Sequence, residues 1–386
     1  MDVEAMFPFP DIDDELLTPA SDTWSQALHE WLSNSSFCPE LHEMFHVQDN
    51  RDPEPIERAI ATIPRGNGWL PAAVLLSCLP NLTSLNLRLG DPSYSTQTFL
   101  PIVRRITRDN HSALQKLRTV KLTPSSNESI DYLLIKAFMA FPSVRTIHGI
   151  KAVGMLDEVH GPPEWCLPLV TSDSNVSKLI LDGEEESYDY DQGPFTWLHN
   201  LLPLLPRLRD FRFSCSDYGF NAGNGTAYLV ATLLKYVAKS LEHLFIKGFY
   251  AYEEYPDLRT LGSFTALQSL EISYLGFLPL DDTPAFDIFQ RLPPNLRHLR
   301  LWEALDKELV RDLHHFPQMI RRDVKGTKLE KIDLYPEDMG DNSRDSGLVR
   351  ELIQAGLMHG ILVDVSFVYQ ARMPDPAEGD PTKDWR

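Results

Sequence analysis

The chain has 386 residues, 43% of them hydrophobic and 24% charged, and its 55 acidic against 36 basic residues give a formal net charge of −19. This hydrophobic fraction is typical of a globular protein and excludes a mostly disordered chain. The negative charge argues against binding to nucleic acid or to an anionic membrane surface, and no apolar run approaches the roughly 18–20 residues that a membrane-spanning helix needs.

The first 78 residues are predicted to form an acidic tail followed by helices. Residues 1–15 lack the basic segment and apolar core of a secretory signal, so we do not expect secretion. Between residues 16 and 78, hydrophobic residues recur at helical spacing, most regularly from Trp24 to Leu32. We therefore predict a helical N-terminal cap over residues 16–78.

This N-terminal region contains one literal catalytic motif, His42-Glu43-x-x-His46. On a helix the two histidines would face the same side and could bind zinc, with Glu43 as the general base. A catalytic zinc also needs a third protein ligand, and Asp52 stands where the extended motif would place a further histidine. We therefore predict no metal site and no cofactor, and a zinc hydrolase through these residues stays an alternative.

The strongest signal in the sequence is an internal repeat between residues 79 and 368. Three apolar residues spaced as L-x-x-L-x-L recur about nine times, at intervals of 26 to 35 residues. Within each L-x-L the two apolar side chains point to one side of a strand and the residue between them to the other. The copies begin at Leu82, Leu117, Val144, Val176, Leu208, Leu241, Leu267, Leu296 and Leu329.

Segments with helical periodicity lie between the predicted strands, for example at residues 130–138, 228–236 and 348–353. Prolines such as Pro142 and Pro206 end these segments just before the next strand. Each repeat is then a strand followed by a returning helix, and stacking of repeats buries both. We predict an α/β fold, a leucine-rich-repeat solenoid (horseshoe) with a parallel sheet on the concave face, helices outside and the helical cap at its N-terminus.

The end of the array and the cysteines complete this domain organisation. Hydrophobic residues at positions 361, 363, 365 and 367 alternate with others, which predicts a last strand, and the Pro- and Asp-rich residues 369–386 are predicted to be a disordered tail. The four cysteines are widely spaced and form no CxxC pair. This usage favours reduced thiols and a cytoplasmic or nuclear location.

The phrase Leu-Pro-x-Leu-x-x-Leu-x-Leu at residues 79–87 and 205–213, with a looser copy at 292–301, resembles fungal leucine-rich-repeat proteins of the F-box-like group. The resemblance covers about residues 70–368. It implies a horseshoe that holds a protein and, in members with an F-box, delivers it to a cullin–RING ubiquitin ligase. Residues 16–63 have the length of an F-box but lack its Leu-Pro-x-Glu opening. Binding of a ligase adaptor through these helices is therefore an alternative.

Residues that alternate with the apolar positions are expected to line the concave face. Twenty-seven such positions carry seven lysines and arginines against four carboxylates, a net charge of +3 on a chain of −19. A basic face would attract an acidic partner segment, and Trp, Tyr and Arg are common interface residues. The candidate ligand-binding residues are Lys121, His148, Lys178, Arg212, His243, Phe245, Lys247, Arg300, Trp302 and Tyr335.

These patterns favour binding over catalysis. The sequence has neither a phosphate-binding Gly-Lys-Ser/Thr loop nor a G-x-S-x-G elbow. We predict a non-enzymatic protein–protein interaction module that binds a protein or an acidic peptide segment on the concave face. The alternatives are a substrate-recognition subunit of a cullin–RING ubiquitin ligase with a divergent F-box, and the zinc hydrolase.

Overall fold

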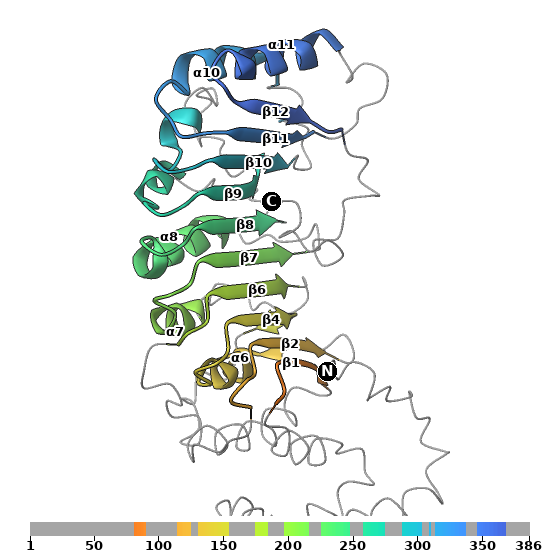
Figure 1. The fold of residues 1–386 in the computed structure, drawn as a ribbon, viewed down its shortest axis with the longest axis vertical. Helices are drawn as coiled ribbons and strands as arrows, with labels where there is room; N and C mark the ends of the chain where they lie inside the picture. Colours follow the sequence, from red (N-terminus) through yellow and green to blue (C-terminus); the bar gives the residue numbers. More distant parts are fainter. Residues whose placement is uncertain are drawn as a thin grey trace, which may run out of the picture. The chain divides into compact units, whose positions relative to one another are not determined.

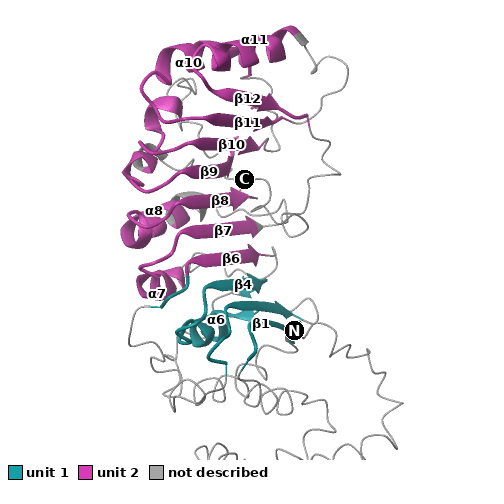
Figure 2. Cartoon of the chain, viewed as in Figure 1, with its two compact units in different colours: residues 1–176 teal, residues 177–386 magenta. Residues whose placement is uncertain are grey.

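The chain divides into two compact units, residues 1–176 and 177–386 (Figure 2). The boundary falls within the predicted repeat array. The computed structural model describes residues 81–89, 114–124, 130–153, 174–183, 197–215, 225–247, 258–274, 288–302, 309, 313–336 and 346–367. The predicted acidic tail, helical cap and C-terminal tail, and the His42-Glu43-x-x-His46 motif, lie outside these residues. None of the described helices has the length and apolar character that crossing a bilayer would require.

The described residues of the first unit form three parallel strands of one sheet and a short second strand pair. Leu85 of β1 lies opposite Val120 of β2, and Val120 lies opposite Ile147 of β4. All three side chains are at most 1% exposed, so these strands contribute directly to the core. The elements are β1 (Ser84–Leu89), β2 (Thr119–Pro124), β3 (Ile130–Asp131), α6 (Tyr132–Met139), β4 (Thr146–Ile150) and β5 (Ala152–Val153).

Helix α6 begins later than its periodicity predicts. The pattern indicates a helix from residue 130, but Ile130 and Asp131 pair in parallel with β5 and form β3 instead. Asp131 then caps the helix, because its Oδ1 accepts a hydrogen bond of 2.9 Å from the backbone N–H of Leu133. The apolar side of α6, including Phe138, is buried. The hydrophobic spacing therefore located the helix correctly, except for its first turn.

In the second unit, the described residues form seven parallel strands that follow one another in sequence order (Figure 1). They are joined by short α-helices and 3₁₀ helices. The strands are β6 (Lys178–Gly183), β7 (Asp210–Cys215), β8 (His243–Lys247), β9 (Ser269–Ser273), β10 (His298–Trp302), β11 (Lys331–Tyr335) and β12 (Leu362–Val365). The connecting helices are α7 (Leu198–Leu201), η7 (Leu202–Leu204), α8 (Gly225–Val237), η8 (Leu258–Ser263), η10 (Ile288–Arg291), η11 (Leu313–His315), α10 (Phe316–Asp323) and α11 (Ser346–Leu357).

The strand positions predicted from the repeat are confirmed. Each strand from β6 to β11 begins two residues after the first apolar residue of its copy, as Asp210 of β7 does after Leu208. The alternating apolar residues are buried, and Phe211 and Phe213 are 0% and 1% exposed. Burial of one such ring stabilises the fold by roughly 1.5–3 kcal/mol. The last predicted strand is present as β12, in which Val363 is 4% exposed and Leu362 57%.

The returning helices are less uniform than predicted. Helices α8 and α11 confirm the periodicity at residues 228–236 and 348–353. Between β8 and β10, however, the described connections are the 3₁₀ helices η8 and η10. The copies that begin at residues 241 and 267 have 26 and 29 residues, but the 27-residue copy that begins at residue 117 contains the α-helix α6, so the length of a copy does not by itself select the type of helix.

Candidate functional site

The strands of the second unit present a face of mainly polar residues, which we call the polar face. In β6 to β11 the first, third and fifth residues alternate with the buried apolar ones, and the parallel register aligns them in three rows. The first row is Lys178, Asp210, His243, Ser269, His298 and Lys331. The central row is Ile180, Arg212, Phe245, Glu271, Arg300 and Asp333, and the third row is Asp182, Ser214, Lys247, Ser273, Trp302 and Tyr335.

Arg300 lies between two carboxylates of the central row. Its Nη1 is 3.1 Å from Glu271 Oε2 on β9, and its Nε is 3.4 Å from Asp333 Oδ2 on β11. Lys331 Nζ lies 3.0 Å from Asp333 Oδ1, in an ion pair that lacks good hydrogen-bond geometry. Glu271 and Asp333 are 8% and 3% exposed, so the guanidinium compensates charge that water reaches poorly.

Trp302 is tied to the same network. Its indole N–H donates a hydrogen bond of 2.7 Å to Glu271 Oε1. Its ring stacks on Tyr335 with centroids 4.2 Å apart and an interplanar angle of 14°. Lys247 Nζ lies 5.8 Å from the Trp302 ring centroid, and the Arg300 guanidinium 5.6 Å from that of Tyr335. Aromatic and cationic groups from three strands are thus held in one fixed cluster, which we call the Trp302 cluster.

Burial and the neighbouring charges shift the pKa values of these groups in opposite directions. Burial raises the pKa of Glu271, and the positive charge of Arg300 and the Trp302 hydrogen bond reduce that rise. Burial also lowers the pKa of Arg300, but Glu271 and the neighbouring acidic groups more than offset it and the net shift is upward. Burial raises the pKa of Tyr335 as well. Arg300 is therefore a permanent cation at neutral pH, and Tyr335 keeps its proton.

A second network joins β6 and β7. Asp210 accepts hydrogen bonds from Arg212 Nε at 3.1 Å and Nη2 at 3.2 Å, and Lys178 Nζ lies 3.2 Å from Asp210 Oδ2. In the third row of the same two strands, Ser214 donates a hydrogen bond to Asp182. Five lysines and arginines of the polar face stand against four carboxylates, a net charge of +1. Its positive charge is thus largely compensated inside the face.

The structure separates the ten predicted site residues into two sets. Lys121 and His148 lie opposite each other on β2 and β4 of the first unit. The other eight lie on the polar face of the second unit, where Lys247, Arg300, Trp302 and Tyr335 come together in the Trp302 cluster and Lys178 and Arg212 share Asp210. His243 stands opposite Asp210, and Phe245 stands in register between Arg212 and Glu271.

Two of the predicted aromatic residues are more covered than their place on this face suggests. Phe245 is 9% exposed and Trp302 6%. The Trp302 ring is stacked against Tyr335, which is itself only partly buried. Tyr335 and Lys247 therefore form the accessible side of the Trp302 cluster. The buried Trp302 ring contacts both of them, by stacking on Tyr335 and by lying under the Lys247 ammonium.

The prediction of site residues overlooked the carboxylates that hold the arginines. Glu271 and Asp333 occupy the central row on either side of Arg300, and Asp210 lies two residues before Arg212. For Arg300 the repeat alignment contains the signal, since Glu271 and Asp333 stand at the same copy position in the two neighbouring repeats, whereas Asp210 lies on the same strand as Arg212. Charges opposite each other on adjacent strands are expected to pair.

Comparison with known proteins gives no family assignment, since no protein-family model matches the chain and no curated protein is similar to it. Within the described part of the chain, no group of three or more His, Cys, Asp or Glu residues is arranged to hold a metal ion. The polar face is therefore interpreted from its own geometry. It offers fixed cations, hydroxyls and one stacked aromatic pair.

Proposed function

We propose that the protein is a leucine-rich-repeat horseshoe with a non-enzymatic role, and that its polar face binds a protein segment carrying a carboxylate next to an apolar side chain. The observation that carries this proposal is the Trp302 cluster, in which Tyr335 stacks at 4.2 Å on a Trp302 ring that is fixed by its hydrogen bond to Glu271. Tyr, Trp and Arg dominate the energetics of protein interfaces.

Pre-organisation supports binding at this face. Because ion pairs and the indole hydrogen bond already hold Arg300 and Trp302, a ligand would lose little affinity to the ordering of these side chains. Lys247, beside the aromatic pair, supplies the positive group for a ligand carboxylate. The apolar side of the same ligand would pack on Tyr335.

The dimensions of the face suit an extended segment. Strands in a sheet lie about 4.8 Å apart, so the six strands from β6 to β11 span roughly 24 Å. An extended chain advances about 3.3 Å per residue, so a segment of about seven residues would cross the face. The net charge of +1 predicts a ligand with few acidic residues rather than a long acidic run.

The test compares two matched double variants. Lys247→Ser with Tyr335→Ser removes the accessible groups of the Trp302 cluster. Lys235→Ser with Tyr236→Ser removes a similar pair from helix α8, where Lys235 Nζ lies 4.8 Å from the Tyr236 ring centroid. Proteins captured from a cell extract by each variant and by the unchanged chain are identified by mass spectrometry.

We expect a specific set of proteins that the unchanged chain and the α8 variant retain and the cluster variant loses. A photo-reactive amino acid at position 331, on the rim of the face, should cross-link to the same proteins. Equal capture by both variants, with both folded by circular dichroism, would place ligand binding away from the polar face.

A further inference from the structure

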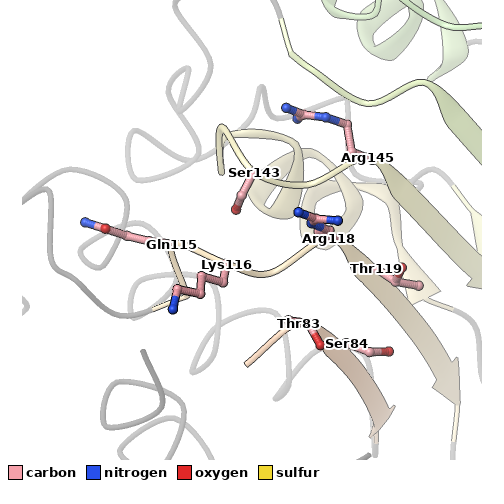
Figure 3. Close-up of a pocket in the computed structure, with 8 residues that line it drawn as sticks. All are labelled: Thr83, Ser84, Gln115, Lys116, Arg118, Thr119, Ser143 and Arg145. Carbon is pink, nitrogen blue, oxygen red and sulfur yellow. The ribbon is translucent and has the colours of Figure 1, made fainter. Parts of the chain in front are cut away.

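The cavity of the first unit does not gather its charged groups around one point. Its volume is about 710 Å³, and Figure 3 shows that the cations lining it, Lys116, Arg118 and Arg145, point in different directions. The contacts of Arg145 are also local, since its Nη1 donates to the carbonyls of Pro142 and Val144 at 2.7 and 3.0 Å. A better-defined surface lies in the second unit, at the free edge of strand β12.

Strand β12 is the last strand in the row (Figure 1), so among the described residues one of its two edges has no neighbouring strand. The N–H group of Ser366 donates to the carbonyl of Leu334 in β11, at 2.9 Å. Backbone groups alternate in direction along a strand, so those of Val363 and Val365 point away from β11, to the free edge. An edge of this kind presents unpaired donors and acceptors to which a further strand can bind.

Exposed hydrophobic side chains gather beside this edge. Among the described residues, the exposed large hydrophobic side chains all lie between residues 353 and 362, in α11, in the turn after it and in β12. Leu357 is 65% exposed, Met358 68% and Leu362 57%. Gly360, with a φ of 72°, forms the tight turn that ends the helix, so Leu357 and Met358 lie just before the start of the strand. Apolar side chains and unpaired backbone groups are thus available at one place.

Asp364 gives the same edge a negative charge. It is exposed and lies opposite Asp333 on β11. Asp210, Glu271 and Asp333 of the polar face all pair with lysines or arginines, whereas no described lysine or arginine forms an ion pair with Asp364. A lysine or arginine on an added strand, opposite Asp364, would supply the absent positive charge.

Charge also selects between the occupants of this edge. If a second copy of the chain paired its own β12 in antiparallel orientation with the outward groups of both Val363 and Val365, the two Asp364 side chains would stand directly opposite each other, which is unfavourable. Each copy also carries a net charge of −19. Residues 369–386 of the chain itself include three prolines, which cannot donate to a strand ladder. A segment of another protein therefore fits the edge best.

We propose that the free edge of β12 binds an extended segment of a partner protein, which adds a strand to the sheet and places an apolar side chain beside Leu362 and a lysine or arginine beside Asp364. Leu362 and Asp364 point to the same side of β12, so one residue separates the two ligand residues. Hydrogen bonds to Val363 and Val365 supply affinity, and the two side chains supply selectivity. This ligand is basic and its surface is separate from the Trp302 cluster, so the proposal can fail while the proposed function of the polar face holds.

The test selects peptides of about seven residues from a random library displayed on phage, with the full chain as bait, and measures the affinity of the enriched peptides by fluorescence polarisation. We expect these peptides to carry an apolar residue and a lysine or arginine two positions apart. Asp364→Lys should weaken their binding about tenfold, because an attraction becomes a repulsion, and should favour peptides in which glutamate replaces the basic residue. Glu242→Lys is the matched control, since it reverses a partly exposed charge just before β8, and should leave binding unchanged.

Backbone changes test the strand pairing itself. N-methylation of the peptide at residues whose N–H groups face β12 should abolish binding, whereas N-methylation of the residues between them should be tolerated. Val365→Pro removes one outward N–H group without removing a donor to β11, and should also abolish binding. If circular dichroism shows that Val365→Pro does not fold, the methylated peptides decide the test.

Three results would overturn the proposal. The first is a selection that enriches no peptide, and the second is binding that Asp364→Lys leaves unchanged or that tolerates every N-methylation. The third is a chain that sediments as a dimer and becomes a monomer with Val365→Pro, because a second copy would then occupy the edge. The double variant Lys247→Ser with Tyr335→Ser should not affect the selected peptides. Peptides that only this double variant loses bind the polar face and would support that proposal instead.

Discussion

Removing the guanidinium of Arg300 should destabilise the second unit in a pH-dependent way. Arg300→Leu keeps part of the side-chain volume but leaves Glu271 and Asp333 without their shared cation. Loss of one partner from a buried ion pair costs about 3–5 kcal/mol, because the other partner stays charged and poorly hydrated. The Arg300 side chain is 16% exposed, so water partly reaches the site. We therefore expect a loss near the lower limit, about 3 kcal/mol near neutral pH.

The pH dependence follows from Glu271. Burial raises its pKa in the folded state, so the folded protein binds a proton that the unfolded chain releases. Such a group contributes stability that is complete below the pKa of the unfolded chain and is lost as the pH rises through the folded pKa. Arg300→Leu removes the charge that limits this rise, so the pKa of Glu271 should rise further. The destabilisation should consequently be largest at about pH 8 and smaller at about pH 5, where protonation relieves the uncompensated charge.

Urea unfolding monitored by circular dichroism at the two pH values measures this effect. Glu271→Gln added to Arg300→Leu should recover part of the lost stability and remove most of the pH dependence. Arg297→Leu is the matched control, because its ion pair with Glu330 is exposed and should change stability by less than about 1 kcal/mol. Equal destabilisation by Arg300→Leu at both pH values would refute the role assigned to Glu271.

Two further substitutions test the packing of helix α11 and the start of helix α6. Gly356→Ala in α11 would place a Cβ 2.7 Å from the carbonyl oxygen of Ile361 and against the Val363 side chain, so we expect a loss of about 1–3 kcal/mol in urea unfolding. Unchanged stability would contradict this close approach. Asp131→Ala removes the cap hydrogen bond to Leu133 and should cost about 1 kcal/mol, whereas Asp131→Asn should retain most of the stability in thermal unfolding.

The repeat pattern predicted the strands because it records burial directly. An apolar residue at every second position has only one stable arrangement in a strand, with its side chain in the core. Phe211 and Phe213 satisfy this pattern, and so does Val363 in the last strand. Helix starts were less predictable, since Ile130 is apolar in either structure and its place in β3 depends on pairing with Ala152.

The residues of the polar face were predicted from the sequence, but whether each charged side chain is paired depends on contacts between repeats. The alternation in the sequence assigned Arg300, Trp302 and Tyr335 to one face, and all three lie there. Arg300 pairs with carboxylates 29 and 33 residues away, and Trp302 donates to one of them from 31 residues away. These pairs place the carboxylates directly against the cations, so most of the positive charge of the face is compensated locally.

The sequence by itself determined where the strands lie, that their alternating apolar residues are buried, and the excess of negative charge over the whole chain. Only the tertiary structure decided which of the positive groups are compensated. Arg300 lies between Glu271 and Asp333, and Lys178 and Arg212 share Asp210. Burial follows from the periodicity of one strand, whereas the electrostatics of a surface depend on which residue the register places opposite on the next strand.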